Sequence, residues 1–486
     1  MQWSDQLTAT NDPDILRYFV ASGFPLPTFP AAGDRARCFL DPCTARVGIV
    51  NSGGPAPGLN VVNDSIVKRH FSLADDCKCA KGKDSAPVIY GYLGGFSGLA
   101  NAYAESEADN KRRLIPSHGL ERPVAKGEPT YFVTDDHALD PVTFLKSSRF
   151  NLSANIPRVV EQIERERLDV LYVVGGDGSL TGAQEIKSAL ESRKPPYRSE
   201  AGNELIVMGA PKTMDNDVLF TDTTFGFTTT VDYLVDAIRT FHHTVECQDR
   251  VGVMQVFGAG SGYVALYAAY SSGEVDYVIL PELVECEGIR AILGPDAERC
   301  IDLARFVGIR QSLAEVAGPT ATLLSIYDAG LRKVIGQAKH RVVDRVIKKR
   351  HALVVVAEGA LGPYEHGERT KLVISFKDLV GVLKTGLEDA SGCGKGPKWL
   401  KDVKVTSMEP TYLIRDNAPR SYDIALCKFI GKAMVDAALA GYTDCMVARW
   451  CGQYGLIPLS LATALTSRVD PHDYFFRTMA EKYRRR

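Results

Sequence analysis

Short runs of aliphatic and β-branched residues recur through the middle of the chain, separated by stretches with apolar residues on one helical face. The runs are typical of buried strands and cover 46–51, 88–92, 170–174, 205–208, 251–256, 277–280 and 352–356. Helical patterns cover 61–70, 156–167, 182–192, 229–247 and 262–272. The run at 170–174 is apolar throughout, as expected for a parallel strand covered on both faces. This alternation predicts an α/β fold with a mostly parallel sheet.

The size of the chain predicts more than one lobe. It has 486 residues, which exceeds what one small hydrophobic core holds together. Residues 1–45 are rich in Pro, Gly and Asp and resemble an N-terminal arm, and 387–398 is a loop rich in small residues.

Charge and cysteine usage narrow the class of protein. The formal net charge of -2 argues against nucleic acid as the main partner, because phosphate-backbone binding needs a surplus of basic side chains. We find neither an apolar run of about 20 residues, the length of a membrane span, nor a secretory or peroxisomal signal. The eleven cysteines form no CxxC pair. These features predict a cytoplasmic protein with reduced, mostly buried thiols.

Four glycine-rich turns follow predicted strands, where ligands bind in parallel α/β sheets. In the turn 52–58, Gly53 and Gly54 let backbone N–H groups approach an anion, although a tight strand-to-helix connection has the same sequence. In the turn 175–179, Asp177 lies among glycines. A carboxylate beside a phosphate cradle implies a bridging cation, so we expect Mg²⁺ there.

The third turn, 211–217, carries the richest chemistry. It reads PKTMDND and supplies Lys212, Thr213, Asp215 and Asp217. These residues offer a phosphate clamp, a proton acceptor and a metal partner within seven positions, although an isolated run of this kind also suits a solvated loop. The fourth turn, 257–262, is a weak signal. Neither GxxxxGK[ST] nor a clean GxGxxG is present, so phosphate binding here uses another framework.

The order of these motifs resembles the phosphofructokinase family over about residues 46–465. The resemblance rests on SGGPAPGLN, VTFLKSSR, GGDGSLTGA, APKTMDNDV, TFGF, VFGAGSGY, ILPE, VVVAEG, EPTYLIRDNAP and LAGYT. Lys212 and the Tyr412–Arg415 pattern are similar to the longer ATP-dependent branch of plants and trypanosomatids and to its pyrophosphate-dependent relatives.

The resemblance implies two Rossmann-like lobes with mostly parallel sheets, an N-terminal arm and an inserted helical element. The expected donor-phosphate lobe is 46–228, and the sugar-phosphate lobe is 229–465. The insertion lies at about 285–345, where helical spacing recurs, and 466–486 forms a C-terminal tail. The insertion suits a lid, an oligomer contact or an effector element.

The donor-side roles implied by the resemblance concern Mg²⁺ and ATP as co-substrate. Gly54 corresponds to a backbone cradle for the donor phosphates, Asp177 to the metal-associated carboxylate, and Arg149 to an arginine that bridges donor and transferring group. Further donor or catalytic contacts are implied for Gly53, Gly176, Gly178, Ser179 and Lys212.

The acceptor-side roles implied by the resemblance begin with Asp215, the general base that takes the proton from the sugar hydroxyl, and Thr213, which orients substrate phosphate. Asp217 corresponds to a second carboxylate near the metal. Contacts to the sugar phosphate are implied for Phe257, Gly258, Glu282 (sugar hydroxyls), Tyr412 and Arg415. Arg250 corresponds to an arginine that reaches the sugar phosphate of a neighbouring subunit, which implies a homodimer or homotetramer.

The choice of phosphoryl donor follows from two positions. Pyrophosphate users of the family typically carry Asp where this chain has Gly178, and that carboxylate repels the α-phosphate of a nucleotide. Gly178 leaves the space open and favours ATP. Lys212 accompanies pyrophosphate use, although relatives that combine Gly with Lys use ATP, so pyrophosphate is the alternative donor.

Departures from the family pattern concern positive charge near the acceptor. Ala259 stands where relatives carry Arg, and Thr406 stands where they carry Arg or Lys. Lys146, at a usual Gly position, or Lys404 could compensate. Three functions follow: a 6-phosphofructokinase of glycolysis, a kinase of a different sugar, sugar phosphate or nucleoside, and a non-catalytic regulatory paralogue. The intact carboxylates of the motifs argue against the last.

Overall fold

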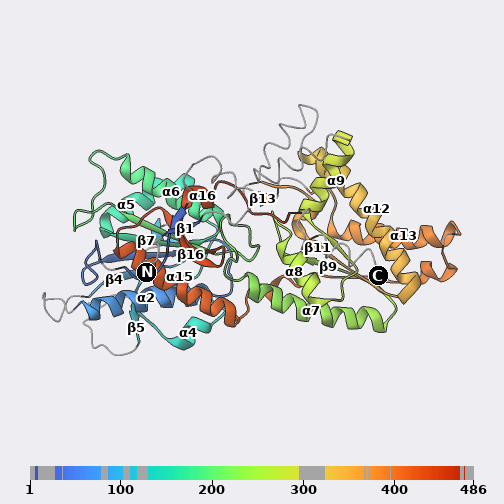
Figure 1. Ribbon diagram of the computed structural model, residues 1–486, viewed down its shortest axis with the longest axis horizontal. Helices are drawn as coiled ribbons and strands as arrows, with labels where there is room; N and C mark the ends of the chain where they lie inside the picture. The colour runs from blue at the N-terminus through green and yellow to red at the C-terminus, as the bar shows by residue number, and fades with distance from the viewer. Residues whose placement is uncertain are drawn as a thin grey trace. The chain divides into compact units, whose positions relative to one another are not determined.

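The computed structural model of the chain (Figure 1) shows two compact units. Unit 1 comprises Met1–Thr213, Val218–Thr228 and Asp416–Ala464, and unit 2 comprises Met214–Asp217, Thr229–Arg415 and Leu465–Arg486. The residues that the structure describes are 6–8, 28–35, 37–77, 86–101, 110–117, 130–294, 323–365, 368–369, 372–394, 396–470 and 476. Each unit contains a mostly parallel sheet, which confirms the predicted α/β fold.

Unit 1 is built on an eight-stranded sheet in the order β16-β15-β8-β7-β3-β4-β5-β6. Its strands are β3 (Arg46–Asn51), β4 (Val88–Tyr92), β5 (Lys111–Pro116), β6 (Thr130–Val133), β7 (Val170–Gly175), β8 (Ile206–Pro211), β15 (Cys445–Trp450) and β16 (Gln453–Pro458). The strands β4, β3, β7, β8 and β15 run parallel. The strand β5 pairs antiparallel with β4 and parallel with β6, and β16 pairs antiparallel with β15. The predicted strands at 46–51, 88–92 and 170–174 are confirmed. The strand predicted at 205–208 begins one residue later and runs on to Pro211.

Helices cover both faces of this sheet, which explains its apolar strands. Tyr172 and Val174 of β7 join the core under α2 (Leu59–Asp76) and α15 (Ser421–Leu439). Leu171 and Val173 join the opposite core, under α5 (Ile156–Glu166) and α6 (Asp177–Glu191). A strand buried on both sides has no position for a polar side chain. Shorter elements complete the unit: β1 (Gln6–Thr8), β2 (Thr28–Pro30), α3 (Phe96–Leu99), α4 (Asp135–Leu139), η2 (Ser153–Asn155) and α16 (Leu459–Ala462).

Residues 416–464 correct the predicted domain boundary, because they belong to unit 1 rather than to the lobe predicted at 229–465. The helix α15 lies beside α2 (Figure 1), and the backbone of Gly431 comes so close that a Cβ there would lie 2.7 Å from the Val62 carbonyl oxygen. The strand β15 pairs with β8, with Cys445 opposite Met208. This returning segment therefore completes the sheet and core of unit 1. The chain also passes from unit 1 to unit 2 between Thr228 and Thr229.

His70 on α2 makes the stability of unit 1 depend on pH. Its Nε2 lies 2.9 Å from the Tyr172 hydroxyl, its side chain has no exposed surface, and burial lowers the pKa of His70 to about 3. In the unfolded chain a histidine has a pKa of about 6.5. Below about pH 6.5 the unfolded chain therefore binds a proton that the folded chain excludes, so this contribution to stability falls as the pH falls towards 3.

We expect His70 to remove about 2 kcal/mol of unfolding free energy between pH 7.5 and pH 5.0, at about 1.4 kcal/mol per pH unit below 6.5. His70→Gln keeps a polar group near Tyr172 but does not titrate in this range. Urea unfolding at both pH values should therefore show a smaller loss in the variant than in the wild type. Equal losses in the two proteins would contradict the assignment.

Unit 2 is built on a four-stranded, fully parallel sheet in the order β10-β11-β9-β14. Its strands are β9 (Val251–Val256), β10 (Tyr277–Ile279), β11 (Ala352–Ala357) and β14 (Val405–Met408). Its helices are α7 (Phe227–Cys247), α8 (Tyr263–Ser272), α9 (Pro281–Leu293), α12 (Leu323–Lys349), α13 (Phe376–Gly392) and α14 (Thr411–Arg415), with η4 (Glu358–Leu361), η5 (Lys398–Asp402) and the small pair β12 (Tyr364–Glu365) and β13 (Glu368–Arg369). The predicted strand 251–256 is confirmed, while those at 277–280 and 352–356 each differ by one residue at their ends.

The predicted insertion at about 285–345 is helical where the structure describes it. The helices α9 and α12 pack so closely that a Cβ on Gly330 would lie 1.8 Å from the Val284 carbonyl oxygen. Their apolar side chains belong to the main core of unit 2, so these helices are part of the fold. Residues 295–322, with several of the predicted helical positions, lie outside the described residues. The loop predicted at 387–398 starts later than expected, because α13 continues to Gly392 and buries Leu387.

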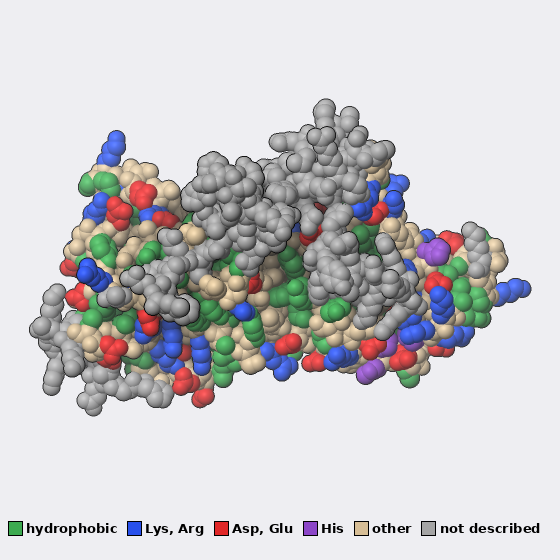
Figure 2. Space-filling model, viewed as in Figure 1, with side chains coloured by type: hydrophobic (Ala, Val, Ile, Leu, Met, Phe, Trp, Pro, Cys, Tyr) green, Lys and Arg blue, Asp and Glu red, His purple; other side chains and the backbone are tan. Residues whose placement is uncertain are grey.

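Three further predictions concern the cysteines, membrane-spanning segments and surface charge. Eight described cysteines are free, but only Cys286, Cys427 and Cys445 of these are buried, so the expectation of mostly buried thiols is wrong in this part of the chain. Cys43 is disulfide-bonded and departs from the expectation of reduced thiols. Within the described ranges no helix combines the length and apolar character that a membrane crossing needs. Acidic and basic side chains are interspersed on the face seen in Figure 2, in line with the near-neutral net charge.

Candidate active site

The predicted donor residues of unit 1 come together at one edge of its sheet. The strands β3, β7 and β8 are parallel neighbours, so the turns that follow them lie at the same edge. Backbone hydrogen bonds join these turns: Ser52 N–H donates to the Val174 carbonyl at 3.0 Å, and Lys212 N–H donates to the Gly175 carbonyl at 3.0 Å. Gly53, Gly54, Gly176 and Lys212 therefore form one cluster, as the sequence predicts.

Lys212 is the buried cation of this donor cluster. Its side chain is 6% exposed, and its Nζ donates to the Gly54 carbonyl oxygen at 2.5 Å. Gly53 has φ +87°, and a Cβ there would lie 3.0 Å from the same Nζ. Glycine at 53 thus gives both the left-handed backbone and the space for the ammonium group. The arrangement holds positive charge against the backbone predicted to cradle phosphate.

The segment that carries Arg149 lies against the same turn. Ser148 forms a parallel bridge with Ser52, Gly53 N–H donates to the Ser148 carbonyl at 3.2 Å, and the Ser147 hydroxyl donates to the Gly53 carbonyl at 2.5 Å. The side chain of Arg149 is exposed. Lys146 is also exposed, with φ +57°. Both cations are therefore adjacent in sequence to serines that contact the donor turn, and both are accessible to solvent.

Asp177, Gly178 and Ser179 form the first turn of α6, which begins five residues earlier than the predicted helix. Gly178 N–H donates to Asp177 Oδ1 at 2.7 Å, and both residues are exposed. A Cβ on Gly178 would meet nothing within 4 Å. This end of a 15-residue helix presents backbone N–H groups and a positive dipole end, with open space above it.

The predicted base, Asp215, lies in unit 2 beside the turn that follows β9. Ala259 N–H donates to Asp215 Oδ2 at 3.4 Å, and the Ser261 hydroxyl donates to the Asp215 carbonyl at 2.7 Å. Gly258 has φ +122°, and a Cβ there would lie 2.4 Å from the Ser261 carbonyl oxygen. Only glycine fits that position. The turn 257–262 thus holds Asp215 at the carboxyl end of β9.

Glu282 is held inside unit 2. It is 4% exposed, and Gly262 N–H and Val469 N–H donate to its Oε1 at 2.8 and 3.1 Å. Burial raises its pKa. Its Oε2 is buried without a hydrogen-bond partner among the described residues. Glu282 therefore accepts hydrogen bonds from the turn 257–262 and from the segment that contains Val469, inside unit 2.

Glu358 is a carboxylate that our sequence analysis noticed only as part of the VVVAEG motif. It directly follows β11, the strand between β9 and β10, and it is partly exposed. The next residue, Gly359, donates from its N–H to the Gly258 carbonyl at 2.9 Å. The sequence feature that could have pointed to Glu358 is its position directly after a fully apolar predicted strand, where ligands bind in parallel α/β sheets.

The structure also brings Arg415 and Phe257 together, with the Arg415 guanidinium carbon 4.9 Å from the ring centroid. Arg415 Nε is buried and has no hydrogen-bond partner in the described part of the chain. Asp217 lies in the same unit, and its carbonyl accepts from Ser467 N–H at 2.7 Å. The side chain of Tyr412 lies outside the described residues.

Arg250 is not brought to this cluster within the chain. It precedes β9, whereas Phe257 follows it, and six residues of strand span about 20 Å. Thr406, on β14, lies opposite Gly252 near the same amino end of β9. Within unit 2, Arg250 therefore lies at the end of β9 opposite to the turn 257–262.

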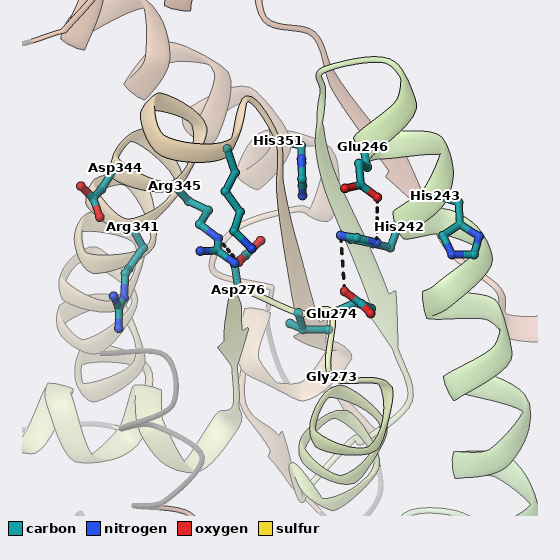
Figure 3. A pocket seen from close by; sticks show the side chains of 12 residues that line it. His242, His243, Glu246, Gly273, Glu274, Asp276, Arg341, Asp344, Arg345 and His351 are labelled. Atoms are coloured by element: carbon teal, nitrogen blue, oxygen red, sulfur yellow. Dashed lines mark ion pairs between the residues drawn. The ribbon is translucent and has the colours of Figure 1, made fainter. Parts of the chain in front are cut away.

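A cavity of about 310 Å³ lies at the amino ends of β10 and β11, away from the turns described above (Figure 3). His242 on α7 lies between Glu246 and Glu274, with nitrogen-to-oxygen distances of 4.0 and 3.7 Å, and its ring centroid is 5.2 Å from that of His351. Burial and the neighbouring His242 lower the pKa of His351. Arg345 pairs with Asp276 at 2.5 Å. Among the described residues no group of His, Cys, Asp or Glu is arranged to hold a metal ion.

Comparison with known proteins gives a consistent result. Residues 46–290 match the Phosphofructokinase family. The chain is 28% identical over 471 residues to an ATP-dependent 6-phosphofructokinase of Amycolatopsis methanolica, covering 94% of this chain and 82% of that protein. It is 26% identical to an ATP-dependent 6-phosphofructokinase of Trypanosoma brucei brucei, covering 93% and 75%.

Among solved structures, a pyrophosphate-dependent phosphofructokinase from Marinobacter aquaeolei has a similar fold. Its TM-score is 0.57 at 16% identity, covering 90% of each chain. The match over half of the sequence, together with the turns that the fold brings to the sheet edges, identifies the chain as a member of the phosphofructokinase family.

Proposed function

We propose that this phosphotransferase moves a phosphoryl group from ATP to fructose 6-phosphate and forms fructose 1,6-bisphosphate. The observation that carries the proposal is the segment 211–217, which supplies Lys212 and Thr213 to unit 1 and Asp215 and Asp217 to unit 2. One short loop thus links the donor turns with the predicted base. In the reaction the sugar hydroxyl oxygen attacks the γ-phosphorus, the bond to the β-phosphate oxygen breaks, ADP leaves, and Asp215 accepts the proton.

The donor half of the proposal rests on the open N-terminus of α6. Gly178 leaves space for a nucleotide, and exposed backbone N–H groups suit phosphate oxygens,. Asp177 is exposed at the same place and would hold Mg²⁺. Mg²⁺ sites often use one or two carboxylates and fill the other positions with substrate phosphates and water, so this chain's residues fit the ion. When bound, the ion neutralises charge on the phosphates.

The acceptor half rests on the carboxyl ends of β9 and β11. Hydrogen bonding from Ala259 N–H holds the Asp215 carboxylate, and Glu358 is an accessible carboxylate for sugar hydroxyls. We propose that Glu358 takes this role rather than Glu282, whose Oε1 is occupied by backbone N–H groups inside the unit. A homodimer or homotetramer in the cytoplasm, with Arg250 reaching a neighbouring subunit, completes the proposal.

A second candidate function, phosphorylation of another acceptor, is favoured by the side chain at 259. Ala259 is partly exposed beside Asp215 and ends at Cβ, so it offers no cation to the transferring phosphoryl group. Transfer depends on positive charge around that group. Arg149, Lys212 and Lys146 are the cations that we expect to contribute.

Ala259→Arg is expected to raise kcat with fructose 6-phosphate, with a smaller change in KM, because the added guanidinium stabilises charge that develops in the transition state. The partly exposed side chain at 259 leaves room for the longer residue. Steady-state kinetics of both proteins test this, with Ala259→Gln as the uncharged control. If the wild type already turns over fructose 6-phosphate at the rate of a typical relative, the charge deficit has no functional meaning.

The decisive test of the proposed function is a product assay. The full chain is incubated with Mg²⁺ and either ATP or pyrophosphate, against a panel of sugar phosphates, free sugars and nucleosides, and phosphorylated products are identified. We expect fructose 1,6-bisphosphate with ATP. Transfer only from pyrophosphate, or to another acceptor, would replace the corresponding half of the proposal, and no transfer at all would favour the non-catalytic paralogue.

A further inference from the structure

The segment 465–470, which the sequence predicts to begin a C-terminal tail, is built into unit 2. Ser467 N–H donates to the Asp217 carbonyl at 2.7 Å, and Val469 N–H donates to Glu282 Oε1 at 3.1 Å. The Tyr263 hydroxyl donates to the Arg468 carbonyl at 2.7 Å. The segment thus contacts the loop 214–217, which contains Asp215, and also the helices α8 and α9.

Arg468 is the charged centre of this segment. Its side chain is 15% exposed. Nε donates to the Gly260 carbonyl at 3.1 Å and lies 4.0 Å from Glu282 Oε1, while Nη1 pairs with Glu285. Nη2 is buried without a hydrogen-bond partner among the described residues. One guanidinium therefore joins the turn 257–262 to two of the buried carboxylates of α9, Glu282 and Glu285.

The contacts of Arg468 lead directly to the proposed base. The Gly260 carbonyl that Arg468 holds belongs to the residue after Ala259, whose N–H donates to Asp215 Oδ2. The following residue, Ser261, holds the Asp215 backbone carbonyl. Any movement of this turn therefore changes the hydrogen bonds that Ala259 and Ser261 donate to Asp215.

We propose that Arg468 is a positioning residue for the acceptor site, which keeps the turn 257–262 and hence Asp215 in place. The expected kinetic effects rest on the proposed function, whereas the positioning of the turn by Arg468 does not depend on it. The geometry supplies a reason for an arginine here. Glu282 and Glu285 are each 4% exposed in the side chain, and buried carboxylates without a paired cation strongly destabilise their surroundings.

The test compares three variants of the full chain. Arg468→Ala removes the contacts to Gly260 and Glu285, and Arg468→Lys retains the charge but loses the forked geometry. Arg345→Ala is the matched control, because Arg345 forms an ion pair with Asp276 in the same unit at a nearly equal side-chain exposure of 16%. The Arg345–Asp276 pair lies at the amino end of β10, whereas the turn 257–262 follows the carboxyl end of β9 in the same parallel sheet.

Hydrogen exchange measured by mass spectrometry reports how tightly the peptides that cover 257–262 and 214–217 are held. We expect exchange in both peptides to be at least tenfold faster in Arg468→Ala than in the wild type. The increase should be smaller in Arg468→Lys, and exchange there should be unchanged in Arg345→Ala. In kinetics we expect kcat to fall about 10- to 100-fold in Arg468→Ala, since small misplacements of a catalytic group have effects of that size. KM for ATP should stay within about twofold, because no donor turn has moved.

The comparison between the variants provides a readout that a loss of stability alone does not produce. Faster exchange should be confined to the peptides that cover 257–262 and 214–217 in Arg468→Ala, and it should be absent there in Arg345→Ala. Unchanged exchange in both peptides would overturn the inference. If the wild type transfers no phosphoryl group, the proposed function fails, and the exchange data still decide the positioning role. If Arg468→Ala does not fold, the same exchange and kinetic measurements on Arg468→Lys decide the inference.

Discussion

Replacing Asp215 by asparagine or serine is expected to lower kcat by about 10²- to 10⁴-fold, the usual contribution of a general base. The Asp215 carboxylate is held by Ala259 N–H beside the turn that follows β9. Asparagine retains an oxygen for that hydrogen bond but accepts no proton. The loss should therefore appear in kcat, and calorimetric titration with ATP should give an unchanged affinity because the donor turns belong to unit 1.

The control for this prediction is Asp249→Asn in the same unit. Asp249 is 55% exposed in its side chain and pairs with Arg350 at 3.4 Å, and such surface pairs contribute little. We expect unchanged kinetics there. If Asp215→Asn retains more than about a tenth of wild-type kcat, well above the loss expected for a general base, then Asp215 does not take the proton.

Gly178→Asp is expected to lower kcat/KM for ATP about 100-fold or more, because like charges in contact cost several kcal/mol. A Cβ at this position meets nothing within 4 Å, so the new side chain extends into space where a nucleotide would lie. It also removes no contact of the folded protein. Parallel assays with ATP and with pyrophosphate measure the effect on each donor.

Gly178→Asn separates charge from size in this experiment. The amide occupies nearly the same volume without a negative charge, so it should lose much less ATP turnover than the carboxylate. Pyrophosphate, which has no α-phosphate to be repelled, should be affected little by either variant. If the wild type uses pyrophosphate and not ATP, or if Asp at 178 leaves ATP turnover intact, then the open space does not select the donor.

The local pattern of the sequence determined most elements and the donor cluster. The run at 170–174 is apolar because β7 is buried on both faces, and its glycine-rich continuation leads into α6. The backbone conformations of Gly53 and Gly258, both with positive φ, suit only residues without a side chain. Such features depend on neighbours along the chain, so a sequence carries them directly. Family resemblance, carried by the same local motifs, added the chemistry.

Long-range packing decided the features that the sequence analysis missed. Residues 416–464 join unit 1 because β15 pairs with β8 and α15 packs on α2, contacts between segments more than 200 residues apart. Arg468 reads as part of a charged tail in the sequence, yet it pairs with Glu285 183 positions earlier. Glu282 follows a strand as Glu358 does, but it is buried and accepts hydrogen bonds from the turn 257–262 and from the segment 465–470. Hydrophobic burial and ion pairing act between residues that are close in space, and distance along the chain does not encode that proximity. The sequence by itself therefore determined the turns and their chemistry, whereas the tertiary structure decided which carboxylates are accessible at the sheet edge and which are held in the core.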